Sequence, residues 1–195
     1  MDKRNIDATK SALLKAAEKL MTEFSDPSEV TSRAVSGEAG VNLAMINYCF
    51  GSREAMLFEV FKKLQSEALN HNSVFGKIIK DDISPKEKLI LLHYESMKIM
   101  LQNYKYVKAV TKFALLDRSI SEERGSFPFI YDHFGGRKTE SECLFAAYQI
   151  SSIHELAVLR HEEIKKVCGI DLTNDETLKK FVTDNINMFL DSEEE

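Results

Sequence analysis

The chain has 195 residues, of which 44% are hydrophobic and 29% are charged. This composition is typical of a globular protein with a sizeable core and excludes a disordered or fibrous chain. The formal net charge of −5 excludes a surface that is basic throughout, so any affinity for nucleic acid must come from a local patch.

Three cysteines are widely spaced and form neither a C-x-x-C pair nor a metal-ligand pattern. They predict reduced thiols in a cytoplasmic protein and no bound metal. No apolar run approaches the ~20 residues that a membrane span needs. The N-terminus has no apolar segment behind its charges, so we expect neither a membrane anchor nor a signal peptide.

Helical periodicity dominates the first part of the chain. Thr31 is the expected N-cap of a short second helix, and Gly40 is expected to turn the chain after it. Ser52 is expected to cap a long fourth helix. The first three predicted helices cover 8–24, 31–38 and 42–49.

Three later helices are expected to begin with a Ser/Thr-x-x-Glu capping box, in which side chains and backbone N–H groups cap each other. The boxes are SPKE at 84–87, TESE at 139–142 and TNDE at 173–176. The predicted helices cover 85–102, 105–118, 127–134, 139–168 and 174–190. Because no strand pattern or internal repeat stands out, the predicted fold class is all-α.

The segment TSRAVSGEAGVNLAMINYCF, residues 31–50, fits two short helices that cross through a tight turn. Val35 and Ile46 would form the small core between them, and Gly40 would take the left-handed conformation that such a turn needs. Asn47 would face outward. The pattern predicts a helix-turn-helix, whose second helix enters the DNA major groove by its N-terminal residues.

Residues 9–61 resemble the DNA-binding domain of the tetracycline-repressor (TetR) family of bacterial transcription regulators. The similar runs are LLKAAEKLM and TSRAVSGEAGVNLAMINYCFGSREAMLFEVF, in which AGV, NYxFGS and the pair Arg53–Glu54 are the most specific pieces. Two positions depart from the family pattern. Cys49 stands where the family usually has histidine, and Gly37 stands where it usually has a better helix former.

The resemblance implies an all-α homodimer with an N-terminal three-helix helix-turn-helix domain at 1–51. A larger helical domain for dimerisation and ligand binding would follow at 52–195. The implied function is sequence-specific DNA binding that regulates transcription. The protein would be a repressor that a small-molecule effector releases from its operator.

Ten residues are expected to contact operator DNA. The start of the third helix would read base edges, while hydroxyls and cations beside it would hold phosphates. The expected contact residues are Thr31, Ser32, Arg33, Asn42, Leu43, Ala44, Met45, Asn47, Tyr48 and Arg53.

The C-terminal part has more bulky apolar residues than a thin bundle needs, mixed with polar groups that could orient a ligand. The resemblance implies an apolar effector site there, although each of these side chains would also suit an ordinary core. The expected lining is His93, Tyr94, Met97, Met100, Phe113, Phe127, Phe129, Tyr131, Phe145 and His154. The last two long helices are the expected dimer interface, through Leu144, Tyr148, Ser152, Leu156, Leu159, Phe181, Asn185, Met188 and Phe189.

Other interpretations stay open from the sequence alone. The chain could share the TetR-like fold and act mainly through protein–protein contacts, or it could bind DNA without any effector. An enzyme would need a nucleophile beside a base, and Cys143 or Cys168 with His154 shows no specific spacing. We therefore expect no catalytic residue and no cofactor.

Overall fold

The computed structural model describes residues 3–71, 74–117, 119–120 and 125–191, apart from the side chains of residues 3–4 and 65–71. Every regular element within these ranges is a helix, which confirms the predicted all-α class. The chain divides into two compact units, Met1–Ala68 with Asn103–Asp117, and Leu69–Gln102 with Arg118–Glu195. The functional boundary predicted between residues 51 and 52 stays a prediction. None of the described helices is long and apolar enough to cross a membrane.

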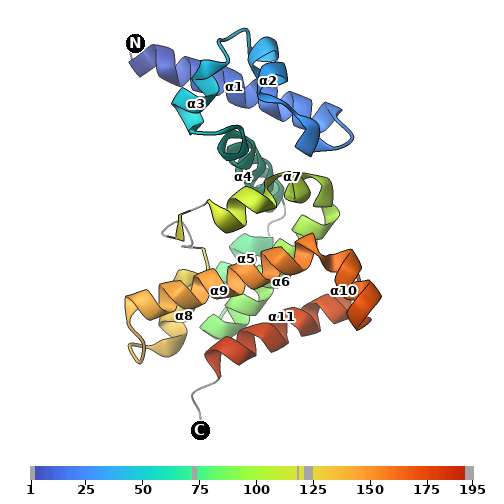
Figure 1. Cartoon of the computed structure of the whole chain (residues 1–195). Helices are drawn as coiled ribbons and strands as arrows, with labels where there is room; N and C mark the ends of the chain where they lie inside the picture. Colours follow the sequence, from blue (N-terminus) through green and yellow to red (C-terminus); the bar gives the residue numbers. More distant parts are fainter. Residues whose placement is uncertain (1–2, 72–73, 118, 121–124, 192–195) are drawn as a thin grey trace. The chain divides into compact units, whose positions relative to one another are not determined.

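The first unit contains the N-terminal helices, most of α4, and α7, which returns to it from later in the chain (Figure 1). Helix α1 packs against α2 and α3, and α7 packs against the short 3-10 helix η1. Leu13, Met21, Ile46 and Leu57 are fully buried in this unit. Its elements are α1 (Lys3–Glu23), η1 (Pro27–Glu29), α2 (Ser32–Ala39), α3 (Ala44–Phe50), α4 (Arg53–His71) and α7 (Tyr104–Leu116).

The helix ends of this unit follow local sequence signals. The Thr31 hydroxyl accepts a hydrogen bond from the N–H of Ala34 at 3.1 Å and caps α2 as predicted. The Ser52 hydroxyl accepts one from the N–H of Ala55 at 3.0 Å, which confirms the predicted start of α4. Gly40 has φ 65°, so the left-handed residue expected after α2 is also confirmed.

The second unit is a bundle in which α6 lies against α8, α9 and α11. Figure 1 shows α9 and α11 running side by side, joined through the short α10. Leu89, Ile130, Ile150, Val182 and Ile186 are among its buried core residues. Its elements are α5 (Val74–Lys80), α6 (Pro85–Gln102), α8 (Phe127–Phe134), α9 (Glu140–Leu159), α10 (His161–Cys168) and α11 (Asp175–Leu190).

Two of the three predicted capping boxes are confirmed. Ser84 and Glu87 cap each other at the start of α6, and Thr139 and Glu142 do so at the start of α9. The third was wrong by one position. Asn174 caps α11 by accepting from the N–H of Thr177 at 3.0 Å, because the hydroxyl of the predicted cap, Thr173, instead donates to Asp171 at 2.6 Å.

Two features of the second unit differ from the predicted helices. Helix α5 was not predicted at all. The helix predicted over 139–168 is broken at Arg160, whose N–H bonds the carbonyls of Leu156 and Val158. The His161 ring lies 2.9 Å from the same Val158 carbonyl, so this carbonyl is satisfied without a continuous helix.

Candidate nucleic-acid interface

The connection between α2 and α3 is a tight, hydrogen-bonded turn. After Gly40, the N–H of Val41 donates to the Ser36 carbonyl at 3.0 Å and closes the end of α2. The Asn42 side chain accepts from the N–H of Ala44 at 2.8 Å. Asn42 therefore closes the turn before α3, but it is not the N-cap as expected: the helix begins at Ala44, and the residue at its N-cap is Leu43, which makes no side-chain capping bond.

One side of α3 is buried and the other is exposed. Ile46 is 1% exposed, which confirms that it points into the core beneath the helix. On the opposite side Leu43 is 45% and Tyr48 is 64% exposed, and Ala44 and Asn47 are exposed with them. Five of the six contact residues predicted between Asn42 and Tyr48 are thus exposed, and four of them share one accessible face of α3. The sixth, Met45, is half-buried at the edge of that face.

The residues predicted to hold phosphates lie at the start of α2. Thr31 and Arg33 are exposed, and Ser32 is half-buried. The Thr31 hydroxyl is already used as the helix cap, so Arg33 is the fixed charge that this end of α2 offers. Lys10 adds a second cation, because its ammonium lies 5.2 Å from the centre of the Phe50 ring at the end of α3.

Arg53 makes internal contacts at the start of α4. Its Nη1 donates to the carbonyls of Ser28 and Val30 at 3.3 and 3.0 Å, and its Nε donates to Glu54 at 3.0 Å. The side chain is 26% exposed. Arg53 therefore ties α4 to the segment that leads into α2, and its predicted phosphate contact stays a prediction.

Gly37 within α2 and Gly40 directly after it allow a matched test of local conformation. A Cβ on Gly37 would enter open space at an ordinary helical position, so Gly37→Ala should stabilise the first unit by about 1 kcal/mol. A Cβ on Gly40 also meets nothing, but the φ of 65° is strained for alanine, so Gly40→Ala should destabilise the unit by about 1–2 kcal/mol. Urea unfolding of both variants measures whether the two changes in stability have opposite signs. Equal changes in stability would contradict the conformations assigned to the two glycines.

The residues predicted to line an effector cavity are spread over the molecule. Phe113 belongs to the first unit, where its ring centre lies 5.5 Å from that of Phe58. Tyr131 and Phe145 are exposed, at 43% and 55%. Met97 is 1% exposed within the core of the second unit. Tyr94, Met100, Phe127 and Phe129 are half-buried.

His93 and His154, also predicted for that cavity, form a buried pair between α6 and α9. Their Nδ1 atoms are 2.9 Å apart, and Nε2 of His93 lies 2.8 Å from the Ser126 hydroxyl. One of the two Nδ1 atoms must donate and the other accept, so at most one of the two rings can carry a charge in this arrangement. Burial lowers the pKa of His93 to about 4, while burial and then the neighbouring His93 lower the pKa of His154.

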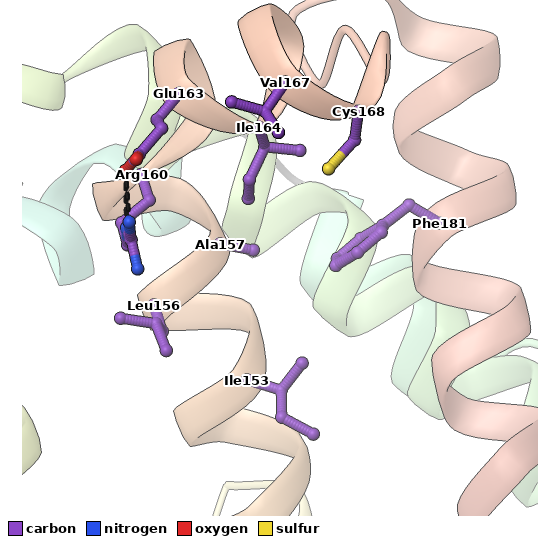
Figure 2. A pocket seen from close by; sticks show the side chains of 9 residues that line it. All are labelled: Ile153, Leu156, Ala157, Arg160, Glu163, Ile164, Val167, Cys168 and Phe181. Carbon is purple, nitrogen blue, oxygen red and sulfur yellow. Dashed lines mark hydrogen bonds and ion pairs between the residues drawn. The ribbon is translucent and has the colours of Figure 1, made fainter.

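A pocket of about 420 Å³ lies elsewhere in the second unit, between the end of α9, α10 and α11 (Figure 2). Its lining is mostly apolar, and Arg160 and Glu163 form an ion pair at one side of it. Figure 2 shows the Cys168 thiol and the Phe181 ring across the pocket from that pair. The lining residues are Ile153, Leu156, Ala157, Arg160, Glu163, Ile164, Val167, Cys168 and Phe181.

None of the ten predicted effector residues lines this pocket. The charged run RHEEIKK, residues 160–166, is typical of a solvated helix face, and α10 buries no residue. Ile164, Val167 and Cys168 nevertheless follow at i, i+3 and i+4 and form an apolar stripe that lines the pocket. This helical spacing of apolar residues was the feature of the sequence that could have predicted the pocket.

In comparisons with known proteins, no family model matches this sequence, and no match to a curated protein was found. The resemblance to the TetR family therefore rests on the motifs within residues 9–61.

Proposed function

We propose that this chain is a sequence-specific DNA-binding regulator of transcription, of the TetR type. The observation that carries the proposal is the exposed face of α3, with Leu43, Asn47 and Tyr48 accessible above the buried Ile46. Leu43 and Tyr48 would be poor choices for a surface that meets only water. They suit a helix that lies in a groove and contacts bases and sugars.

A connector helix is the simplest competing interpretation, and the burial pattern argues against it. A connector of seven residues, the length of α3, has little reason to keep the leucine that precedes it 45% exposed beside a tight turn. The chain also places the exposed Arg33 and the Lys10 ammonium near the ends of α2 and α3, where phosphates would lie.

The proposal is tested by selection of bound duplexes from a random pool, using the full chain. Enrichment of one recurring sequence element is the expected result, and the element should bind more tightly than its shuffled version, by roughly a thousandfold or more, in a gel-shift series. Recovery of unrelated sequences after several rounds would exclude sequence-specific binding.

We also propose that the chain binds as a homodimer through α9 and α11, since a single module of this size covers one half-site. Of the nine residues predicted for this interface, Leu156 is 46% exposed and Met188 is 62% exposed. Phe145 and Ile153 add exposed apolar surface on α9 that was not predicted for the interface. Apolar residues that face outward on two neighbouring helices suit a two-fold contact.

Sedimentation tests the dimer directly. The unmodified chain should be a dimer at micromolar concentration without DNA. Leu156→Glu and Met188→Glu should each weaken dimerisation more than tenfold, because each would bury a charge against the partner. Lys179→Glu alters the charge of α11 at an exposed position and should leave the dimer intact. A monomeric unmodified chain would contradict the proposed interface.

A small apolar effector is the third part of the proposal. The pocket of about 420 Å³ has the size and apolar lining of a ligand site. Leu156 and Phe181 belong both to this pocket and to the proposed dimer faces, so a bound molecule would act on the dimer contact. By linkage, bound operator DNA must lower the affinity for the effector by the same factor by which the bound effector lowers the affinity for DNA. Compounds that bind in the pocket and leave operator affinity unchanged would contradict this regulation.

A further inference from the structure

The exposed face of α3 offers few kinds of hydrogen-bonding group. Leu43, Ala44, Asn47 and Tyr48 make up this face, and between Glu38 and Arg53 the sequence contains no charged residue. The cation that follows, Arg53, donates to the carbonyls of Ser28 and Val30 instead. The reading surface therefore consists of apolar side chains, one amide and one phenol.

The four base pairs demand different chemistry in the major groove. Guanine presents two acceptors, O6 and N7, and is read by the two parallel donors of an arginine or by a lysine. Adenine presents a donor and an acceptor, which match the two ends of an asparagine amide. Thymine presents a methyl group, which favours an apolar contact. The exposed side chains of α3 suit adenine and thymine, and they include no arginine or lysine that could contact guanine.

Two asparagines could supply the amide, and the structure separates them. The side-chain oxygen of Asn42 accepts from the N–H of Ala44, so its acceptor is used in the turn. Asn47 lies one turn into α3 on the exposed face. Leu43 precedes it by four residues and lies on the same side of the helix, because positions i and i+4 are neighbours.

We infer that α3 reads A·T base pairs, with the Asn47 amide on the N6 and N7 edge of adenine and the Leu43 and Ala44 side chains on thymine methyl groups. The inference rests on the proposed function and specifies the operator: the base pairs under α3 are A·T, and no guanine there is required. It also assigns the apolar start of α3 a role, which is to contact methyl groups that only thymine carries among the four DNA bases.

Base analogues in the selected duplex test this inference. Uracil in place of a contacted thymine removes one methyl group and should weaken binding about threefold to fivefold. 7-Deazaadenine in place of the contacted adenine removes the N7 acceptor and should weaken binding roughly tenfold. The same replacements in flanking pairs should change affinity less than twofold.

Two variants connect each loss to its side chain. At the thymine that Leu43 contacts, Leu43→Ala should bind the thymine and uracil duplexes with nearly equal affinity. At the contacted adenine, Asn47→Ala should do the same for adenine and 7-deazaadenine. A selected site that requires guanine under α3, or analogue losses that persist in both variants, would overturn the inference while leaving sequence-specific binding intact. Selection that enriches no sequence would instead overturn the proposed function, and this inference with it.

Discussion

Acidification from pH 6.5 to about pH 4 is expected to cost the second unit on the order of 3 kcal/mol of stability from His93 alone. The pKa of His93 in the folded chain lies below the ordinary value of 6.5. Between pH 6.5 and about 4, His93 therefore binds a proton in the unfolded chain but not in the folded chain. Stability is therefore fully present above pH 6.5, falls as the pH drops toward 4, and levels off below that. The pKa of His154 is shifted in the same direction, so it adds to the loss.

Urea unfolding at a series of pH values, followed by far-ultraviolet circular dichroism, measures this slope. A double variant with His93→Gln and His154→Gln carries no group at these positions that titrates in the window. This variant should be less stable than the unmodified chain at neutral pH, but much of the decline in its unfolding free energy below pH 6.5 should disappear. An unchanged decline in the double variant would show that the acid sensitivity comes from other groups.

Truncation of the side chain beneath α3 should have a similarly large effect on the first unit. Ile46 is 1% exposed, and Ile46→Ala removes buried methyl groups and leaves a cavity where α3 meets α1. The expected loss of unfolding free energy is about 2–5 kcal/mol. Because Ile46 holds the exposed face of α3 in place, operator affinity should fall with it.

Tyr48→Ala is the matched control on the same helix. Tyr48 is 64% exposed, so its truncation should change stability by less than about 0.5 kcal/mol. Operator binding should nevertheless weaken, because Tyr48 belongs to the proposed contact face. Equal stability losses for Ile46→Ala and Tyr48→Ala would contradict the orientation of α3.

Local signals made most of the helix ends predictable from sequence. The caps at Thr31, Ser52 and Ser84 depend on side chains that bond to a backbone N–H three residues away, so tertiary structure adds little to them. Thr173 shows the limit of this approach. Its hydroxyl donates a hydrogen bond to Asp171, two residues earlier, and Asn174 is the N-cap of α11 instead.

Features that depend on packing were not predictable in the same way. His93 and His154 are 61 residues apart, and nothing local indicates that their rings meet at 2.9 Å. The internal contacts of Arg53 with Ser28 and Val30 likewise bridge more than twenty residues. The pocket arises because the chain bends at Arg160 and brings α10 back beside α9, which periodicity alone does not specify.

The most direct test of sequence-specific recognition through α3 is the ratio of affinities for the selected duplex and a shuffled one. We expect a ratio of roughly a thousand or more for the unmodified chain, falling about tenfold in Asn47→Ala. Arg33→Ala should weaken both duplexes equally, keep the ratio, and reduce the salt slope by about one unit. A ratio near one for the unmodified chain would contradict the proposed function.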